Sequence, residues 1–435
     1  MGGHNILWAG PRLERGISLF CHDHGASPFL PCFFLDWRAA FSYGDLNQRG
    51  MTNQPMSVQE IDSILPPGSY YFSGNEAATE GAIVAGCRYY GGYPITPSSE
   101  IMERIAVRLK EVGGVFMQME DEIGSICSVI GAVWAGAKAM TATSGPGFSL
   151  MQEAIGYAAF TETPLVIVDV QRAGPGTGQA TRVGSGDHMQ AKWGSHGDYQ
   201  VIALSPWSVQ EMYDQAIEAF NLAEQYRVPV FLMAEEAVGH LRERMDVKPR
   251  VKVANRIKKK GAPPFGTPED DGVPPMPSFG EGEKLLVTGS THNDVGIRKT
   301  DDGKAHEKLV VRINHKILKH RESIIQTEAY YPDDAEIMVI AYGFTARSAL
   351  FAAERLRKEG KKVGLLRLKT IWPFADQVIR EVGKKARKIF VPEMNRGQIA
   401  GEILKYAECE VVSYCQTDGE IIHPHKIMEQ VRSLL

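Results

Sequence analysis

The hydrophobic pattern between residues 71 and 245 alternates short runs typical of β-strands with longer helical runs. It predicts helices over 75–90, 97–112, 122–139 and 148–160, a strand end over 91–96, and strands over 114–120, 140–144 and 164–172. Strands that alternate with helices are typical of a parallel sheet covered on both faces. We therefore predict a doubly wound α/β domain over residues 51–245.

A second, smaller α/β domain is predicted over residues 333–435, where the alternation resumes. Its predicted strands cover 336–343, 361–368, 387–393 and 408–415, with helices over 345–360, after 371–375 and over 397–407. Between the two domains, residues 246–280 hold seven of the 24 prolines, a composition typical of an extended connector. We interpret residues 246–332 as a long linker or insert.

Residues 1–50 show no helical or strand periodicity and form no signal peptide, because Asp, His and Pro interrupt their apolar stretch. We expect them to form a poorly ordered extension. A more ordinary sequence begins at Met51, so an upstream start is our hypothesis for the origin of the extension. A native N-terminal peptide from within residues 1–50, found by mass spectrometry, would contradict it.

Composition indicates a globular protein of the cytoplasm. Hydrophobic residues make up 43% of the chain and charged residues 23%, and no run of 18 apolar residues predicts a membrane span. The formal net charge of −4 gives no general attraction to nucleic acid. We interpret the basic cluster at 256–260 as a solvated part of the linker.

The cysteines argue against a metal centre held by this chain alone. No two are spaced as C-x-x-C, and six cysteines in a chain of this length fit reduced thiols. His423 and His425 are interpreted as part of a surface turn, since nothing near them completes a ligand set. The six cysteines are Cys21, Cys32, Cys87, Cys127, Cys409 and Cys415.

Four strand ends carry groups that could bind a ligand. The first ends at Thr96, the next at residues 120–122, the third at residues 144–147, and the last at Arg172 before a glycine-rich segment. Open α/β sheets bind ligands at the carboxyl ends of their strands. Each group also has a structural explanation, such as a helix cap for Thr96 and first-turn acids at 120–122. Spacing alone predicts only a ligand-binding α/β protein.

The segments read together resemble a known family. Four long segments carry the resemblance: "GNEAATEGAIVAGCRYYGGYPITPSSEI", "GGVFMQMEDEIGSICSVIGAVWAGAKAMTATSGPGFSLMQE", "TPLVIVDVQRAGPGTGQAT" and "MQAKWGSHGDYQVIALSPWSVQE". They are similar to the α subunits of 2-oxoacid:ferredoxin oxidoreductases, and the similarity extends from about residue 71 to the C-terminus. It implies a thiamine diphosphate pyrimidine-binding domain followed by a domain similar to the transketolase C-terminal domain.

The resemblance also implies a cofactor site. The carboxylate before "IGS" maps to Glu122, although Glu120 and Asp121 are close enough that the register stays open. Such a glutamate hydrogen-bonds a ring nitrogen of the aminopyrimidine and promotes removal of the thiazolium proton. Further residues implied in cofactor binding are Tyr93, Pro94, Ile95, Ser144 and Gly145.

Thr96 and Arg172 match the family's substrate residues. An arginine presents a planar fork of donors to a carboxylate, and a threonine hydroxyl bonds a keto or carboxylate oxygen. Both are implied to be catalytic together with Glu122. The segments at 177–181 and 186–204 are closer to the 2-oxoglutarate members than to those acting on branched-chain 2-oxoacids or pyruvate. His188, Lys192 and His196 are candidates for facing a second carboxylate, with surface roles as the alternative.

The chain lacks the GDG motif and following Asn that hold the diphosphate and magnesium. The resemblance therefore implies a β subunit that carries this motif, the magnesium ion and a [4Fe-4S] cluster, with no metal on this chain. Further γ and ferredoxin-like δ subunits, ferredoxin, coenzyme A and a dimer of heteromers are implied. The expected reaction converts 2-oxoglutarate to succinyl-CoA, or runs as the reverse carboxylation.

Two other interpretations stay open. A β-type subunit of a lipoamide-linked 2-oxoacid dehydrogenase has the same two-domain layout, and a lipoyl-domain partner in place of an iron–sulfur partner would favour it. A scaffold that has lost its chemistry is the other alternative. Residues Thr96, Glu122 and Arg172 are all present, which argues against a scaffold.

Overall fold

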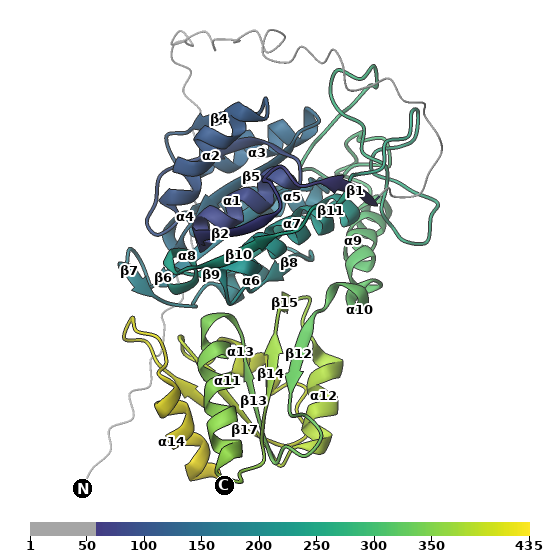
Figure 1. Ribbon diagram of the computed structural model, residues 1–435. Helices are drawn as coiled ribbons and strands as arrows, with labels where there is room; N and C mark the ends of the chain where they lie inside the picture. Colours follow the sequence, from purple (N-terminus) through teal and green to yellow (C-terminus); the bar gives the residue numbers. More distant parts are fainter. Residues whose placement is uncertain (1–57) are drawn as a thin grey trace, which may run out of the picture. The chain divides into compact units, whose positions relative to one another are not determined.

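Two mainly parallel sheets, each covered by helices on both faces, make up residues 58–435, the part of the chain that this computed structural model describes (Figure 1). This arrangement confirms the predicted doubly wound α/β class. The expectations for residues 1–50, and for Cys21 and Cys32 within them, lie outside the described residues.

The larger sheet has eight strands and runs in the order β15-β8-β9-β6-β5-β3-β4, with β7 paired to β6. Neighbours from β8 to β4 are parallel, whereas β7 and β15 run antiparallel to their partners. The central strands are buried on both faces, which explains their continuous apolar runs. The bounds are β3 Cys87–Gly92, β4 Val115–Gln118, β5 Lys138–Thr143, β6 Val166–Ala173, β7 Gln179–Val183, β8 Ile202–Leu204, β9 Val230–Glu235 and β15 Thr370–Trp372.

Helices on the two faces of this sheet belong to two separate hydrophobic cores. One face is covered by α1 (Gly74–Val84), α2 (Ser99–Glu111) and α7 (Val209–Tyr226), and α1 packs closely along α7 (Figure 1). The other face is covered by α3 (Glu122–Trp134), α4 (Gly145–Leu150) and α5 (Gln152–Phe160). Short helices α6 (His188–Trp193) and α8 (Glu236–His240) follow β7 and β9.

Two small antiparallel pairs lie outside the larger sheet. Strand β1 (Val58–Asp62) pairs with β11 (Arg250–Ala254), and β2 (Gly68–Ser73) pairs with β10 (Arg242–Val247). Both pairs join the start of the described chain to the segment that follows β9. These pairings therefore tie the beginning and the end of the first domain together. The local hydrophobic pattern did not predict them.

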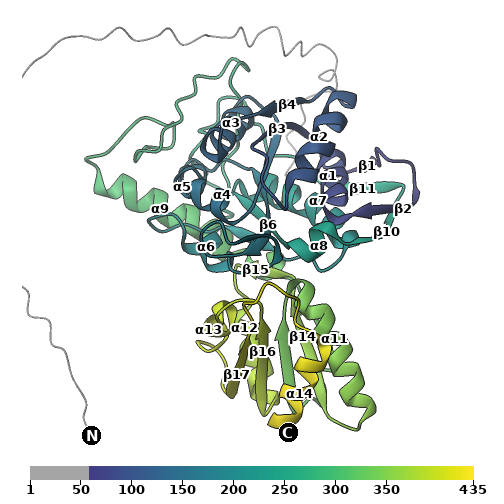
Figure 2. The ribbon, with the colours of Figure 1, turned by 90° about the vertical axis from the view of Figure 1, so that its left-hand side faces the viewer.

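The second sheet has five strands in the order β12-β14-β13-β16-β17, and only β12 is antiparallel. Helices α11 and α14 lie on one face and α12 and α13 on the other (Figure 2). The bounds are β12 Thr327–Tyr330, β13 Ile337–Ala341, β14 Val363–Leu368, β16 Lys388–Glu393, β17 Glu410–Cys415, α11 Gly343–Lys358, α12 Asp376–Lys385, α13 Gln398–Ile403 and α14 Pro424–Leu434.

The segment interpreted as an extended linker is only partly extended. Residues 255–302 contain no regular helix or strand, but α9 (Gly303–Leu318) and α10 (Arg321–Ile324) follow, and β12 already belongs to the second sheet. Arg256 is buried and paired with Glu224 at 2.6 Å, so the interpretation of the whole basic cluster as solvated was wrong. Packing against the first domain orders this segment, which local composition could not reveal.

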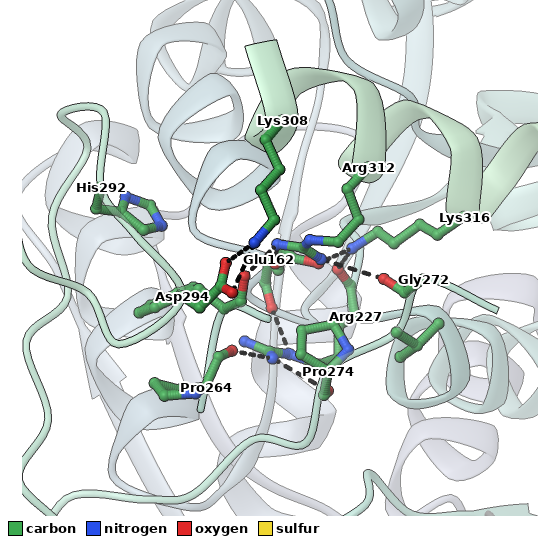
Figure 3. Close-up of polar contacts among 12 residues, drawn as sticks. Glu162, Arg227, Pro264, Gly272, Pro274, His292, Asp294, Lys308, Arg312 and Lys316 are labelled. Carbon is green, nitrogen blue, oxygen red and sulfur yellow. Dashed lines mark hydrogen bonds and ion pairs between the residues drawn. The ribbon is translucent and has the colours of Figure 1, made fainter. Parts of the chain in front are cut away.

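A buried ionic cluster joins this segment to the first domain (Figure 3). The Glu162 carboxylate accepts hydrogen bonds from Arg312 at 2.6 and 2.8 Å and from Lys316 at 2.7 Å, both on α9. The Arg227 guanidinium donates to the backbone carbonyls of Pro264 and Pro274. Fully buried charges of this kind require partners, and here the partners come from α9 and the irregular segment.

One local prediction in the first domain needs correction. The helix predicted over 75–90 ends at Val84, because Gly86 has a φ of 96° and Cys87 begins a central strand. Helix α2 has no side-chain cap at its N-terminus. Ser98 occupies the N-cap position, but its hydroxyl donates to the carbonyl of Ile95 at 2.9 Å.

Candidate functional site

The predicted site residues follow neighbouring strands of the larger sheet. Thr96 follows β3, Glu122 follows β4, Ser144 and Gly145 follow β5, and Arg172 lies near the end of β6. These four strands are adjacent and parallel in the order β4-β3-β5-β6. Parallel strands bring their carboxyl ends to one edge. The fold therefore brings the four predicted groups to the same edge of the sheet.

The loop after β3 presents exposed side chains while its backbone is held in place. Thr96 is exposed, and so is Tyr93, with 39% of its surface accessible. The Asn75 side chain donates to the carbonyl of Pro97 at 2.9 Å, and the Arg172 guanidinium donates to the carbonyl of Thr96 at 2.8 Å. The Thr96 hydroxyl is therefore presented to the surroundings from a loop with a restrained backbone.

The three acidic residues after β4 differ in their surroundings. Glu120 is exposed, and the Asp121 carboxylate caps α3 by accepting from the backbone N–H of Gly124 at 2.7 Å. Glu122 is the buried one, with 5% of its surface accessible. The Asp121 carboxylate is therefore engaged in capping its own helix, and Glu122 is the one of the three acids that is buried.

The turn between β5 and α4 lies against Glu122. A Cβ atom added to Gly147 would stand 2.4 Å from Oε1 of Glu122, so only glycine leaves room for the carboxylate here. The hydroxyl oxygens of Thr143 and Ser144 are buried and have no hydrogen-bond partner within the described chain. The predicted cofactor residues Ser144 and Gly145 therefore adjoin the buried glutamate.

Two further carboxyl groups, on β6 and just before α6, were not among the residues predicted from the sequence. Asp169 is fully buried on β6, and Asp187 precedes α6. Burial and the adjacent Asp187 raise the pKa of Asp169 well above its usual range. Burial raises the pKa of Asp187 to about 6, although Asp169 and Arg172 oppose the shift. An aspartate inside the apolar run at 164–170 was the available signal.

The three candidates for facing a second carboxylate differ in burial and contacts. His188 is fully buried with its ring 4.6 Å from that of Tyr342, and burial lowers its pKa to about 3. The Lys192 ammonium donates to the carbonyl of Tyr199 at 2.8 Å. His196 is exposed. The Lys192 ammonium is therefore engaged within the protein, whereas both ring nitrogens of His188 are buried without a hydrogen-bond partner in the described chain.

Residues 58–435 carry neither a metal-ligand cluster nor a membrane-spanning helix. No group of three or more His, Cys, Asp or Glu side chains there could hold a metal ion. His423 caps α14 with its ring nitrogen instead of joining a ligand set. No helix of this part of the chain is both long and apolar enough to cross a membrane.

The donor set at the edge fits the aminopyrimidine half of thiamine diphosphate. Such a ring requires a carboxylate opposite a ring nitrogen and polar partners for its amino group. Glu122 supplies the buried carboxylate, while Ser144 and Thr143 supply buried hydroxyls without partners in the chain. Nothing comparable to a diphosphate cradle was found in the sequence, so the fit concerns the pyrimidine half.

Comparison with known proteins agrees with this fit. Residues 80–312 match the thiamine diphosphate-binding domain of pyruvate flavodoxin/ferredoxin oxidoreductases. Residues 335–427 match core domain II of pyruvate:ferredoxin oxidoreductase. The chain therefore belongs to the 2-oxoacid:ferredoxin oxidoreductase family, as its sequence motifs predicted, and thiamine diphosphate is the cofactor of the matched domain.

Two relatives and one solved structure show how similar the chain is to individual proteins. The chain is 50% identical to the 2-oxoglutarate synthase subunit KorA of Methanothermobacter thermautotrophicus over 83% of its own length and 98% of the relative's. It is 37% identical to the ketoisovalerate oxidoreductase subunit VorB of the same organism, covering 83% and 96%. A solved structure of the 2-oxoglutarate:ferredoxin oxidoreductase from Magnetococcus marinus superimposes with a TM-score of 0.80 at 32% identity, covering 85% of this chain and 65% of that one.

Proposed function

We propose that this chain is the α subunit of a heteromeric enzyme that oxidatively decarboxylates 2-oxoglutarate to succinyl-CoA, with coenzyme A and ferredoxin, or runs the reverse carboxylation. The observation that carries the proposal is the 50% identity with a 2-oxoglutarate synthase subunit over nearly the whole of that relative. The gathering of Thr96, Glu122 and Arg172 at one sheet edge supports it.

Glu122 is proposed to hold the aminopyrimidine ring. When bound, thiamine diphosphate supplies a carbon nucleophile and an acceptor for the electrons released by decarboxylation. The buried Glu122 carboxylate would accept a hydrogen bond from the protonated ring nitrogen and so favour the imino form of the ring's amino group, which can then act as a base. The turn at residues 144–147 and the loop at Tyr93, Pro94 and Ile95 would lie on either side of the same ring.

Arg172 and Thr96 are proposed to bind the 2-oxoacid. The Arg172 guanidinium uses one nitrogen for the Thr96 carbonyl, which leaves other donors for a substrate carboxylate. The exposed Thr96 hydroxyl lies on the loop that this bond restrains. Together they would orient the 2-oxo carbon toward the cofactor, where orientation contributes a large share of catalysis.

A β subunit is proposed to complete the site with its GDG motif, magnesium ion and [4Fe-4S] cluster. The absence of that motif and of clustered cysteines from this chain supports the division. Coenzyme A, ferredoxin, and γ and ferredoxin-like δ subunits are further proposed partners, in a dimer of heteromers in the cytoplasm. Within the α subunit, residues 51–245 would hold the pyrimidine and residues 333–435 would brace the assembly.

A branched-chain 2-oxoacid is the second candidate substrate, because the chain is also 37% identical to a ketoisovalerate oxidoreductase subunit. The two candidates differ in the substrate's far end, a carboxylate in one and a branched apolar group in the other. The 37% identity with this subunit is lower than the 50% identity with the 2-oxoglutarate synthase subunit, which favours 2-oxoglutarate as the substrate. Pyruvate is the third candidate substrate and is assayed with the other two.

The test is to coexpress the chain with the partner encoded beside it and to assay viologen reduction, dependent on coenzyme A, with each 2-oxoacid. We expect the largest kcat/KM with 2-oxoglutarate, together with iron and acid-labile sulfide in the partner. Preference for a branched-chain substrate would overturn the substrate assignment. A lipoyl-domain partner, or no turnover of any 2-oxoacid by the cofactor-loaded complex, would overturn the enzyme class.

A further inference from the structure

The segment that leads from the end of β7 into α6, residues 183–189, belongs to the first domain by sequence but is held by side chains from the second half of the chain. The Asn395 amide donates to the Ser185 carbonyl at 2.7 Å. The Trp372 indole N–H donates to the His188 carbonyl at 2.7 Å. Both donors are almost fully buried, so water cannot readily replace them.

Gln398, the first residue of α13, holds the same segment at two further points. Its Nε2 donates to the Gly186 carbonyl at 2.5 Å, and its Oε1 accepts from the Met189 backbone N–H at 3.2 Å. The backbone N–H of Gln398 in turn donates to the Asn395 side chain at 2.9 Å, so the two residues support each other. We call Asn395, Gln398 and Trp372 the clamp residues.

On its other side the segment lies against the end of β6, which carries Arg172. The pairing of β6 with β5 and with β9 ends before Arg172, so Val183 of β7 is the strand partner of Arg172 in the described chain. A Cβ atom added to Gly184 would stand 2.7 Å from the Arg172 carbonyl oxygen, and only glycine permits this approach. The Asp187 N–H donates to the Gln171 side chain at 3.1 Å.

The position of this segment is therefore determined by contacts between the two domains. Backbone carbonyls that are buried need hydrogen-bond donors, and a helix or a sheet usually supplies them locally. Here the carbonyls at residues 185, 186 and 188 receive donors from the clamp residues, which lie more than 180 positions away in sequence. A shift of the clamp residues would move the segment and, through it, the end of β6.

We propose that the clamp residues are positioning residues for substrate binding: by holding residues 183–189 they fix the backbone of Arg172, and so they link the arrangement of the two domains to capture of the 2-oxoacid carboxylate. The inference rests on the proposed function, in which Arg172 binds that carboxylate. It assigns no contact between the clamp residues and the substrate. The second domain thereby takes part in substrate binding as well as bracing the assembly.

The first test is hydrogen exchange of the full chain, followed by mass spectrometry of peptides that cover residues 183–189. In Gln398→Ala the Met189 N–H loses its acceptor, so exchange in this peptide should become about fivefold faster or more. Gln377 is an exposed glutamine near the start of α12, and Gln377→Ala is the matched control that should leave the exchange unchanged. Equal exchange in wild type and Gln398→Ala would overturn the proposal.

The second test is kinetic and uses the enzyme assembled with its partner subunit. Gln398→Ala should raise the KM for 2-oxoglutarate about tenfold with a smaller change in kcat, because the group that moves is a ligand of the substrate carboxylate. The KM for coenzyme A should not change. A purely structural defect would lower the amount of active enzyme and leave both KM values as they are. Faster exchange of residues 183–189 with an unchanged KM for 2-oxoglutarate would overturn the link to substrate binding.

Trp372→Phe is a second, independent variant. It removes the indole donor to the His188 carbonyl and keeps an aromatic ring in the core. We expect the same two changes, faster exchange in residues 183–189 and a higher KM for 2-oxoglutarate. If Gln398→Ala does not fold, Trp372→Phe decides the question, and wild-type exchange and KM in this variant would contradict the proposal.

Failure of the proposed function can be distinguished from failure of this inference. If the wild-type complex turned over no 2-oxoacid, the proposed function would fail. The exchange measurement needs no turnover, so it would still show whether the clamp residues hold residues 183–189. Turnover of 2-oxoglutarate with a wild-type KM in both Gln398→Ala and Trp372→Phe would contradict only the positioning role.

Discussion

Glu122 and Glu120 illustrate at the residue scale how two identical side chains two positions apart differ in role. One is buried against the β5–α4 turn and the other is exposed. Burial of a carboxylate is costly, so its retention beside unpaired hydroxyls indicates a ligand. Asp121 between them is accounted for by its helix cap.

Replacing Glu122 with Gln should lower kcat of the reconstituted enzyme by about two orders of magnitude or more, because an amide cannot support the proton transfer. The matched control is Glu120→Gln, which should stay within a few-fold of wild type. Substrate-dependent viologen reduction measures both. Survival of turnover in Glu122→Gln within a few-fold would show that the mapping is wrong.

Gly147→Ala tests the space beside Glu122. The added Cβ would stand 2.3 Å from Oγ1 of Thr143 and 2.4 Å from Oε1 of Glu122, so one of these groups must move. We expect weaker binding of thiamine diphosphate, measured by fluorescence quenching in the assembled enzyme. Gly131→Ala on α3 is the control, since its Cβ would meet nothing within 4 Å. Equal affinity in both variants would contradict the placement of the cofactor.

At the scale of elements, the ionic cluster around Glu162 orders a segment that has little regular structure of its own. Arg312 and Lys316 are one turn apart on α9 and meet the same carboxylate (Figure 3). The irregular residues 264–275 are held by their carbonyls to Arg227. Helix α9 is therefore fixed to the first domain by charge as well as by apolar packing.

Glu162→Gln should destabilise the protein by about 3–5 kcal/mol, because two cations would stay buried without a counter-charge. The melting temperature in a calorimetric scan measures the effect. Glu359→Gln, at the exposed pair with Arg432, is the control and should leave the melting temperature nearly unchanged. Similar melting temperatures for the two variants would refute the structural role of the cluster.

The same carboxylate predicts a pH dependence of stability. Burial opposes ionisation of Glu162, but Arg312 and Lys316 outweigh it and hold the pKa of this group well below its usual range. A depressed carboxyl pKa stabilises the folded state above the unfolded-state pKa of about 4.3, and this stabilisation is lost as the pH falls below it. Denaturant unfolding at pH 3–6 should therefore show a shallower acid loss in Glu162→Gln than in wild type. Parallel curves would contradict the assignment.

At the scale of the whole molecule, the two sheets are joined by direct pairing and by buried polar contacts. Strand β15 extends the first sheet from within the second half of the chain. Glu235 of β9 accepts from the backbone N–H of Phe344 at 2.5 Å, and burial raises its pKa to about 8. Asn395 donates to the carbonyl of Ser185 at 2.7 Å. The two halves of the described chain are therefore joined by strand pairing and by buried hydrogen bonds.

The incomplete cofactor site leads to a prediction about assembly. Because the chain has a fitting pyrimidine side and no diphosphate motif, we expect the isolated chain to reduce no viologen with any 2-oxoacid, even with thiamine diphosphate and magnesium. Addition of the partner should restore turnover in proportion to the complex formed, as measured by size-exclusion chromatography. Turnover by the isolated chain would contradict the division between subunits.

The sequence by itself determined the α/β class, most strands of the two sheets, and the candidates Thr96, Glu122 and Arg172. Those features depend on local periodicity and on ordered motifs, which a linear pattern carries. The helix predicted over 75–90 was too long, because residues 87–90 belong to β3 and its pairing with β4 and β5 involves segments that lie further along the sequence.

Only the tertiary structure decided which of three neighbouring acids is buried, which strand ends adjoin, and which charges influence each other. Asp169 and Asp187 are 18 residues apart, and the fold brings them close enough for Asp187 to raise the pKa of Asp169. The order of residues 255–318 likewise depends on Glu162 and Arg227, which lie far from them in sequence. Contacts between segments that are distant in the sequence determine which side chains are buried and which charges are paired. A local sequence pattern does not show these contacts.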